Sequence, residues 1–152
     1  MHEERLKSLG INLPDPASPS FNYVPVTVHR GVAYVSGQVP KVDGEVRVFG
    51  KVGAEVDLET AQGEARVCVL QGLACLRAEL GSLDRIERIL KINGYVASAP
   101  GFNGQPSVLD AASDLLGEIF GAAGRHARAA VGVAELPRDC AVEIEMTVAV
   151  RD

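Results

Sequence analysis

The sequence is poor in the residues that most often carry metal or redox chemistry. It has no tryptophan, three histidines and three cysteines, and an aromatic fraction of 5%. The cysteines, Cys68, Cys75 and Cys140, cannot all pair within one chain, and none lies in a C-x-x-C or C-x-x-H cluster. The histidines are too scattered along the chain to predict a metal site. We therefore expect reduced, inert thiols and no bound metal.

Basic residues and long apolar runs are also scarce. Lys and Arg number 15 against 20 Asp and Glu, which gives a formal net charge of −5. A protein that follows a phosphate backbone should instead carry an excess of basic residues. No apolar run approaches the roughly 20 residues that span a bilayer, and the first residues do not form a signal peptide. We expect a cytoplasmic protein that binds neither nucleic acid nor membrane.

The chain is long enough for one globular domain with its own core, since it has 152 residues of which 47% are apolar. Residues 3–9 predict two helical turns, and Pro14, Pro16 and Pro19 prevent that helix from continuing. We divide the chain into an N-terminal arm, residues 1–20, and a single domain, residues 21–152. The apolar residues of the arm should pack onto the domain; they are Leu6, Leu9, Ile11 and Leu13.

Periodicity predicts an α+β domain. Alternating apolar residues indicate strands near 24–28, 32–36, 86–96, 127–134 and 141–150, and Asp43-Gly44 is typical of a type I′ hairpin turn. One helix should begin after Asp57 and stop at Gly81; a second should be capped by Gln105 or Ser107 and stop at Gly121. Two helices would then cover one face of a mixed sheet, and the other face should meet a partner chain.

Arg128 is the unusual residue of the second half, because it enters a strand of small apolar residues. A guanidinium in that setting needs a partner. One interpretation is an internal ion pair with Glu143 or Glu145; the other is a bidentate clamp for a substrate carboxylate. If the last two strands formed a hairpin, Arg128 and Glu143 would share a face about 13 Å apart, with room for a small acid and a water.

Three short segments resemble the YjgF/RidA family of reactive-intermediate deaminases. They are Ser36-Gly37-Gln38-Val39-Pro40, the run from Arg128 to Pro137, and Val142-Glu143-Ile144-Glu145, and the resemblance covers residues 21–152. It implies a chorismate-mutase-like α+β fold in a homotrimer that encloses a central barrel. It also implies hydrolysis of 2-aminoacrylate and related enamines or imines to 2-keto acids and ammonia, in clefts between subunits and without metal or cofactor.

The resemblance assigns site residues one by one. Arg128 matches the arginine that holds the substrate carboxylate, and Glu143 matches the acid that handles water. Tyr23 matches an aromatic residue at the mouth of the cleft, and Gly37 and Ala130 match positions whose backbone faces the ligand. The family usually has Pro-Ala-Arg-Ser-Cys where this chain has His126-Ala127-Arg128-Ala129-Ala130, so the chain represents a distinct branch.

Two other functions remain open at this point. The same clefts could bind a carboxylic acid as a regulatory module, without turnover. Ribonuclease or translation-inhibitor activity is the third hypothesis, and the negative net charge and scarcity of aromatic residues weigh against it.

Overall fold

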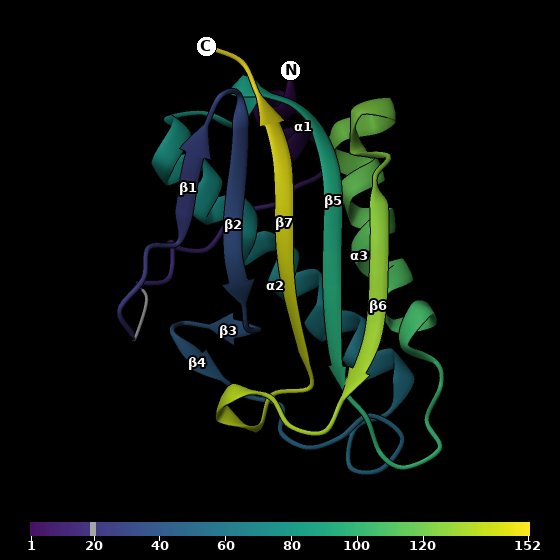
Figure 1. Ribbon diagram of the computed structural model, residues 1–152. Coiled ribbons are helices and arrows are strands. Elements are labelled where there is room, and N and C mark those ends of the chain that lie inside the picture. The colour runs from purple at the N-terminus through teal and green to yellow at the C-terminus, as the bar shows by residue number, and fades with distance from the viewer. Residues whose placement is uncertain (19–20) are drawn as a thin grey trace.

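The computed structural model of the protein describes residues 1–18 and 21–152. A five-stranded sheet forms one layer and two long helices lie behind it (Figure 1). In spatial order the strands are β1 (Val26–His29), β2 (Val32–Gln38), β7 (Val142–Val150), β5 (Ile86–Ala97) and β6 (Ala127–Val133). Neighbouring strands are antiparallel except β5 and β6, which run parallel. The sheet is therefore mixed, as expected.

The turn and cap signals of the sequence act where they were expected, with one exception. The hairpin of β3 (Lys41–Val42) and β4 (Glu45–Val46) turns through Asp43 and Gly44, both of which have positive φ as a type I′ turn requires. The Asp57 side chain accepts a hydrogen bond from the Thr60 amide at the start of α2 (Leu58–Leu80). The first turn of α3 (Gln105–Phe120) is capped by Gly104 without a side-chain bond, so the predicted cap at Gln105 or Ser107 was wrong.

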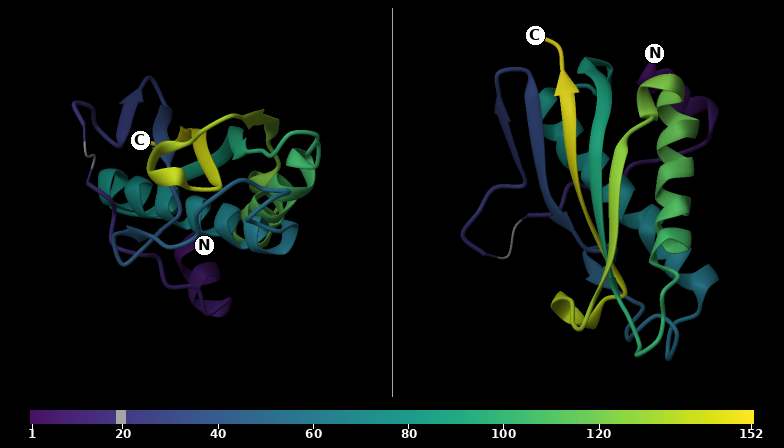
Figure 2. Two further views of the ribbon diagram at one scale, coloured as in Figure 1. Left: turned by 90° about the horizontal axis from the view of Figure 1, so that it is seen from below. Right: turned by 45° about the vertical axis from the view of Figure 1, so that its right-hand side comes forward.

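The hydrophobic core lies between the sheet and the helices (Figure 2). Strand β7 alternates strictly between buried and half-exposed residues, and its buried set faces α2. Three short 3-10 helices connect the elements: η1 (Leu83–Arg85), η2 (Gly121–Gly124) and η3 (Pro137–Asp139). None of the described helices is long and apolar enough to cross a membrane.

The N-terminal arm adds a third helix, α1 (His2–Ser8), on the side of α2 and α3 that faces away from the sheet (Figure 2). Leu6 is only 2% exposed, and the arm's other large apolar residues, Leu9, Ile11 and Leu13, pack against the core. The backbone amides of His2 and Glu3 both donate to the Asp84 carboxylate. The predicted docking of the arm is confirmed, while Pro19, one of the three prolines expected to prevent the helix from continuing, lies outside the described residues.

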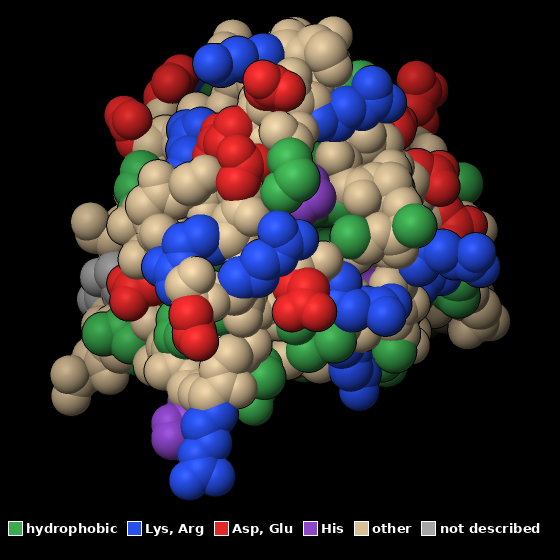
Figure 3. Space-filling model, turned by 90° about the horizontal axis from the view of Figure 1, so that it is seen from above, with side chains coloured by type: hydrophobic (Ala, Val, Ile, Leu, Met, Phe, Trp, Pro, Cys, Tyr) green, Lys and Arg blue, Asp and Glu red, His purple; other side chains and the backbone are tan. Residues whose placement is uncertain are grey.

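No helix among the described residues covers the opposite face of the sheet (Figures 1 and 2). Its residues are a mixture of apolar and acidic side chains, including Tyr34, Val131, Glu143 and Glu145. Seen from the end that carries both termini, the surface mixes acidic and basic side chains, and hydrophobic ones lie in small separate groups (Figure 3).

Candidate active site

A cavity of about 350 Å³ lies where the segment before β1 meets the end of β2 and the start of β7. Three of the predicted site residues line it together: Tyr23, Gly37 and Glu143. The other lining residues were not predicted, because they come from segments that lie far apart along the chain; they are Ala17, Ser18, Phe21, Pro25, Gln38, Val39, Lys41, Pro137 and Arg138.

Gly37 and Glu143 are in direct contact across β2 and β7. A Cβ added at Gly37 would overlap Oε2 of the Glu143 carboxylate. The contact arises at a β-bulge, because the pairing of β2 with β7 shifts register between Val35 and Gln38. Glycine at this position therefore leaves the room that the carboxylate occupies.

The environment of Glu143 favours its protonated form. Burial raises the pKa of the Glu143 carboxyl, and the nearby charge of Glu145 raises it further. No side chain among residues 1–18 and 21–152 hydrogen bonds this carboxylate, although it is half-buried. A carboxyl with a raised pKa that faces a cavity is suited to general acid and base chemistry near neutral pH.

Glu145, by contrast, is held by its neighbours on β5. Its Oε1 accepts hydrogen bonds from the Tyr95 hydroxyl at 2.5 Å and from Nδ2 of Asn93 at 3.0 Å. The bond to Glu145 raises the pKa of Tyr95 to about 12, with smaller contributions from burial and from the charges of Glu145 and Glu143. Glu145 is thus a structural group, and its charge acts on Glu143.

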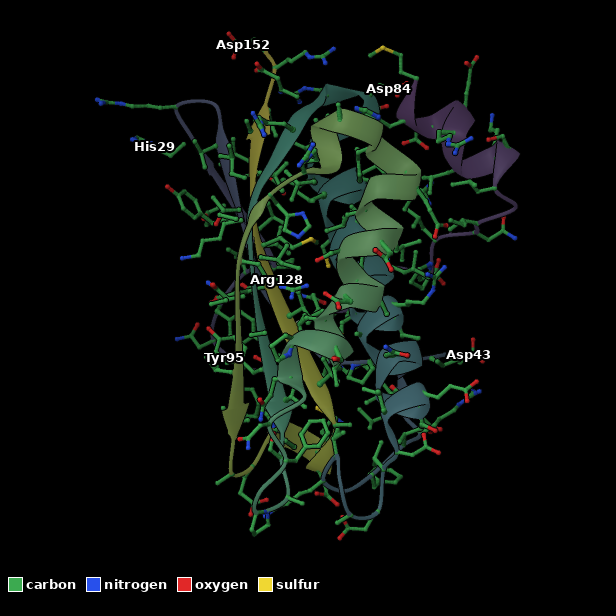
Figure 4. The ribbon with its side chains drawn as sticks, turned by 90° about the vertical axis from the view of Figure 1, so that its right-hand side faces the viewer. His29, Asp43, Asp84, Tyr95, Arg128 and Asp152 are labelled. Atoms are coloured by element: carbon green, nitrogen blue, oxygen red, sulfur yellow. The ribbon has the colours of Figure 1, made fainter. Side chains whose placement is uncertain are left out.

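Arg128 lies on the other side of the sheet, between β6 and α3 (Figure 4). Its Nη1 donates to Oδ1 of Asp110 at 2.9 Å and to Oγ of Ser113 at 3.1 Å. Its Nη2 lies 3.4 Å from the carbonyl oxygen of Pro106. The predicted ion pair with Glu143 or Glu145 was therefore wrong, and the partner of Arg128 is the exposed end of Asp110 on α3.

Arg128 and Glu143 cannot meet within one chain. The hairpin considered for the last two strands does not form, because β5 lies between β6 and β7. Arg128 is in register with Ile92, which is buried under the helices, whereas Glu143 is in register with Tyr95 on the open face. Two strand spacings amount to roughly 10 Å, and the two side chains leave opposite faces of the sheet.

Ser113 and His126 extend the network around Arg128. Nδ1 of His126 lies 2.6 Å from the Gly124 carbonyl, and Nε2 lies 3.0 Å from Oγ of Ser113. A carbonyl oxygen only accepts, so Nδ1 carries the hydrogen and Nε2 of a neutral ring accepts from Ser113. The Ser113 hydroxyl then offers its lone pairs to Arg128. Ala130, the remaining predicted site residue, follows on the same side of β6 and packs against the core.

The described residues contain no cluster of His, Cys, Asp or Glu that could hold a metal ion. The three cysteines are buried. Burial raises the pKa of each thiol, that of Cys140 to about 12, and the Sγ atoms of Cys68 and Cys140 both donate to the Val142 carbonyl. Thiols with raised pKa values are poor nucleophiles, and none of the three cysteines lines the cavity.

Comparison with known families decides the relationship that the motifs indicated. A family model described as "YjgF/chorismate_mutase-like, putative endoribonuclease" matches residues 3–146. The chain belongs to this YjgF family. The match includes most of the N-terminal arm, so the family resemblance extends beyond the domain from residue 21 in which the motifs were found.

Individual YjgF-like proteins agree with this assignment. Protein TCP17 of Trypanosoma cruzi is 44% identical over 144 residues, which cover 94% of this chain and 90% of that protein. The crystal structure of Atu1372 from Agrobacterium tumefaciens, a protein of unknown function, is 46% identical in sequence, and its TM-score is 0.91. The match covers 99% of this chain and 92% of Atu1372. TdcF of E. coli, solved with bound serine, is 25% identical with a TM-score of 0.63, and the match covers 92% of this chain and 94% of TdcF.

Proposed function

We propose that the protein is an enzyme that hydrolyses small 2-imino acids, such as those formed from 2-aminoacrylate, to 2-keto acids and ammonia. The observation that carries the proposal is the Glu143 carboxyl, which faces a cavity, has a raised pKa and lies against Gly37. The serine bound to TdcF supports a ligand of this size that carries an α-carboxylate. The resemblance of the Arg128 and Glu143 segments to the reactive-intermediate deaminases also supports it, and it agrees with membership of the YjgF family.

We propose further that the site is completed by a neighbouring subunit of a homotrimer. Arg128 and Glu143 leave opposite faces of one sheet, so a substrate that contacts both must lie between two chains. Strand β6 is an edge strand, which leaves Arg128 at the border of its own subunit. Light scattering at micromolar concentration tests the assembly: we expect three times the mass of the chain, and a monomer would contradict the proposal.

The proposed reaction needs no cofactor because a 2-imino acid is already electrophilic at C2. Arg128 of one subunit binds the substrate carboxylate through paired N–H donors, which fixes C2 near the cavity of the next. Glu143 takes a proton from a water while the water oxygen bonds to C2 and the C=N π electrons move to nitrogen. The protonated carboxyl returns this proton to nitrogen, which gives a 2-amino-2-hydroxy acid. Glu143 then takes the hydroxyl proton and delivers it to the amino nitrogen as the C–O bond becomes C=O and the C–N bond breaks, so ammonia and the 2-keto acid leave.

The direct test is turnover. A dehydratase acting on serine or threonine generates 2-aminoacrylate or 2-aminocrotonate in the cuvette, and the enamine tautomerises to the imine and decays to keto acid at a background rate. We expect the protein to accelerate keto-acid release in proportion to its concentration, and Glu145→Gln to retain most of that acceleration. Release at the background rate with both substrates would refute the deaminase and favour a module that binds carboxylates without turnover.

A further inference from the structure

A second cavity of about 530 Å³ adjoins the proposed site on the side of the N-terminal arm. The two cavities share four lining residues, which are Ala17, Ser18, Lys41 and Arg138. Two of the four are cations, and both lie in the same cavity as Glu143. A ligand in the active site therefore has Lys41 and Arg138 within the same enclosure.

Lys41 is half-buried and lacks an acidic partner in the described part of the chain. Lys51, a lysine ten residues further on, pairs with Glu135 at 3.2 Å, but no carboxylate lies within ion-pair distance of the Lys41 ammonium. Asp43, which lines the second cavity, pairs with Arg47 at 3.0 Å. A half-buried ammonium without a counter-charge favours the binding of an anion.

The backbone is constrained at both Lys41 and Arg138. The buried Gln71 side chain donates from Nε2 to the Lys41 carbonyl at 2.9 Å, and its Oε1 is a buried polar atom without a partner among the described residues. Arg138 and Asp139 both have positive φ, 58° and 55°, which is uncommon for residues other than glycine. Strain of this kind is concentrated at ligand sites.

We infer that Lys41 and Arg138 bind a second acidic group of the substrate, so that the protein prefers 2-imino acids with an acidic side chain. This inference rests on the proposed function, because it assumes that Glu143 faces the reacting carbon. Arg128 would hold the α-carboxylate, and the side-chain carboxylate would extend toward Lys41 and Arg138.

The test compares acidic with neutral substrates. Imino acids are generated in place by enzymatic oxidation of aspartate, glutamate, alanine and leucine, and kcat/KM is measured for each. We expect the acidic substrates to be favoured at least about tenfold, because two charge-assisted hydrogen bonds are gained. Equal kcat/KM for acidic and neutral substrates would overturn the inference and leave the proposed function intact. No turnover of any imino acid would overturn the proposed function.

Variants assign the preference to the two cations. Lys41→Met should reduce the ratio of acidic to neutral kcat/KM about tenfold or more, as should Arg138→Asn, in which asparagine tolerates the left-handed backbone. Lys7→Met, on the exposed side of α1, is the matched control and should leave the ratio unchanged. A ratio that Lys41→Met and Arg138→Asn both leave intact would contradict the assignment.

A binding measurement does not depend on turnover. Calorimetric titration with 2-oxoglutarate and 2-oxobutyrate should show tighter binding of the dicarboxylate to the wild-type protein, and this difference should be lost in both charge variants. Melting curves identify any variant that has failed to fold, in which case Lys41→Gln replaces Lys41→Met. Equal affinity for the two keto acids would contradict the second acidic site, whatever the outcome of the kinetic assays.

Discussion

Gly37→Ala should separate the activity of the site from the stability of the fold. The backbone of Gly37 does not adopt the left-handed conformation, so alanine fits its φ and ψ, but the new Cβ would overlap Oε2 of Glu143. The obstacle is the end of a flexible side chain, which can turn away. A non-ideal Glu143 rotamer costs of order 0.5–1.5 kcal/mol. Alanine recovers about 0.4–1 kcal/mol by restricting the unfolded chain.

The net change in unfolding free energy should thus stay within about 1 kcal/mol, or about 4 °C in Tm for a domain of this size. The carboxylate, however, must move by an ångström or more, which costs about a hundredfold in rate when a catalytic group is displaced. Keto-acid release and thermal melting measure the two effects on the same sample.

Two controls define the result. Gly63→Ala makes the same substitution at an exposed position of α2 with no heavy atom within 4 Å of the new Cβ. It should stabilise the protein by about 0.5–1 kcal/mol and leave turnover unchanged. The double variant Gly37→Ala/Glu143→Gln should lose no more rate than Glu143→Gln alone, because both changes act through one carboxylate. Near wild-type turnover by Gly37→Ala would refute the role given to Glu143.

Three further predictions follow from individual contacts. Arg128→Ala should abolish most turnover but cost only about 1 kcal/mol of stability or less, since its partner Asp110 is 62% exposed and regains water. Arg128→Lys should recover little turnover, because an ammonium lacks the paired donors of a guanidinium. Wild-type rates in Arg128→Ala would exclude Arg128 from the site. Glu143→Gln should raise Tm at pH 7 and lose that advantage at pH 4. The pKa of the Glu143 carboxyl is higher in the folded than in the unfolded protein, so the wild type loses stability as the pH rises from the unfolded pKa through the folded pKa. A gain in Tm that does not depend on pH would contradict this. Leu6→Ala should destabilise the protein by about 2–5 kcal/mol with kcat unchanged, because Leu6 is buried between the arm and the domain; parallel loss of kcat in the folded variant would give the arm a catalytic role.

The parts of the structure that the sequence predicted are those set by local signals. Asp57 and Gly81 bound α2, Asp43-Gly44 turns the hairpin, and the alternation of β7 selects its buried face. Each of these signals acts within a few residues of the chain. The parallel pairing of β5 and β6 was not predicted, although the helical crossover through α3 returns the chain in the same direction.

The errors and omissions concern contacts between distant segments. Reading β6 and β7 as a hairpin put Arg128 and Glu143 on one face, whereas β5 separates them. The actual partner of Arg128, Asp110, is a helical residue with no sequence signal that distinguishes it from other surface acids. Lys41 begins β3 and Arg138 lies in η3, almost a hundred residues further along the chain, and only the folded structure brings them to one cavity.

Mixing two inactive variants tests most directly whether Arg128 and Glu143 act from different subunits. Co-expressed Arg128→Ala and Glu143→Gln chains should form mixed trimers in which about one quarter of the interfaces combine an intact Arg128 with an intact Glu143. Imino-acid turnover should then recover to roughly a quarter of the wild-type rate per site, far above either variant alone. Turnover in the mixture no higher than in the separate variants would contradict a site shared between subunits.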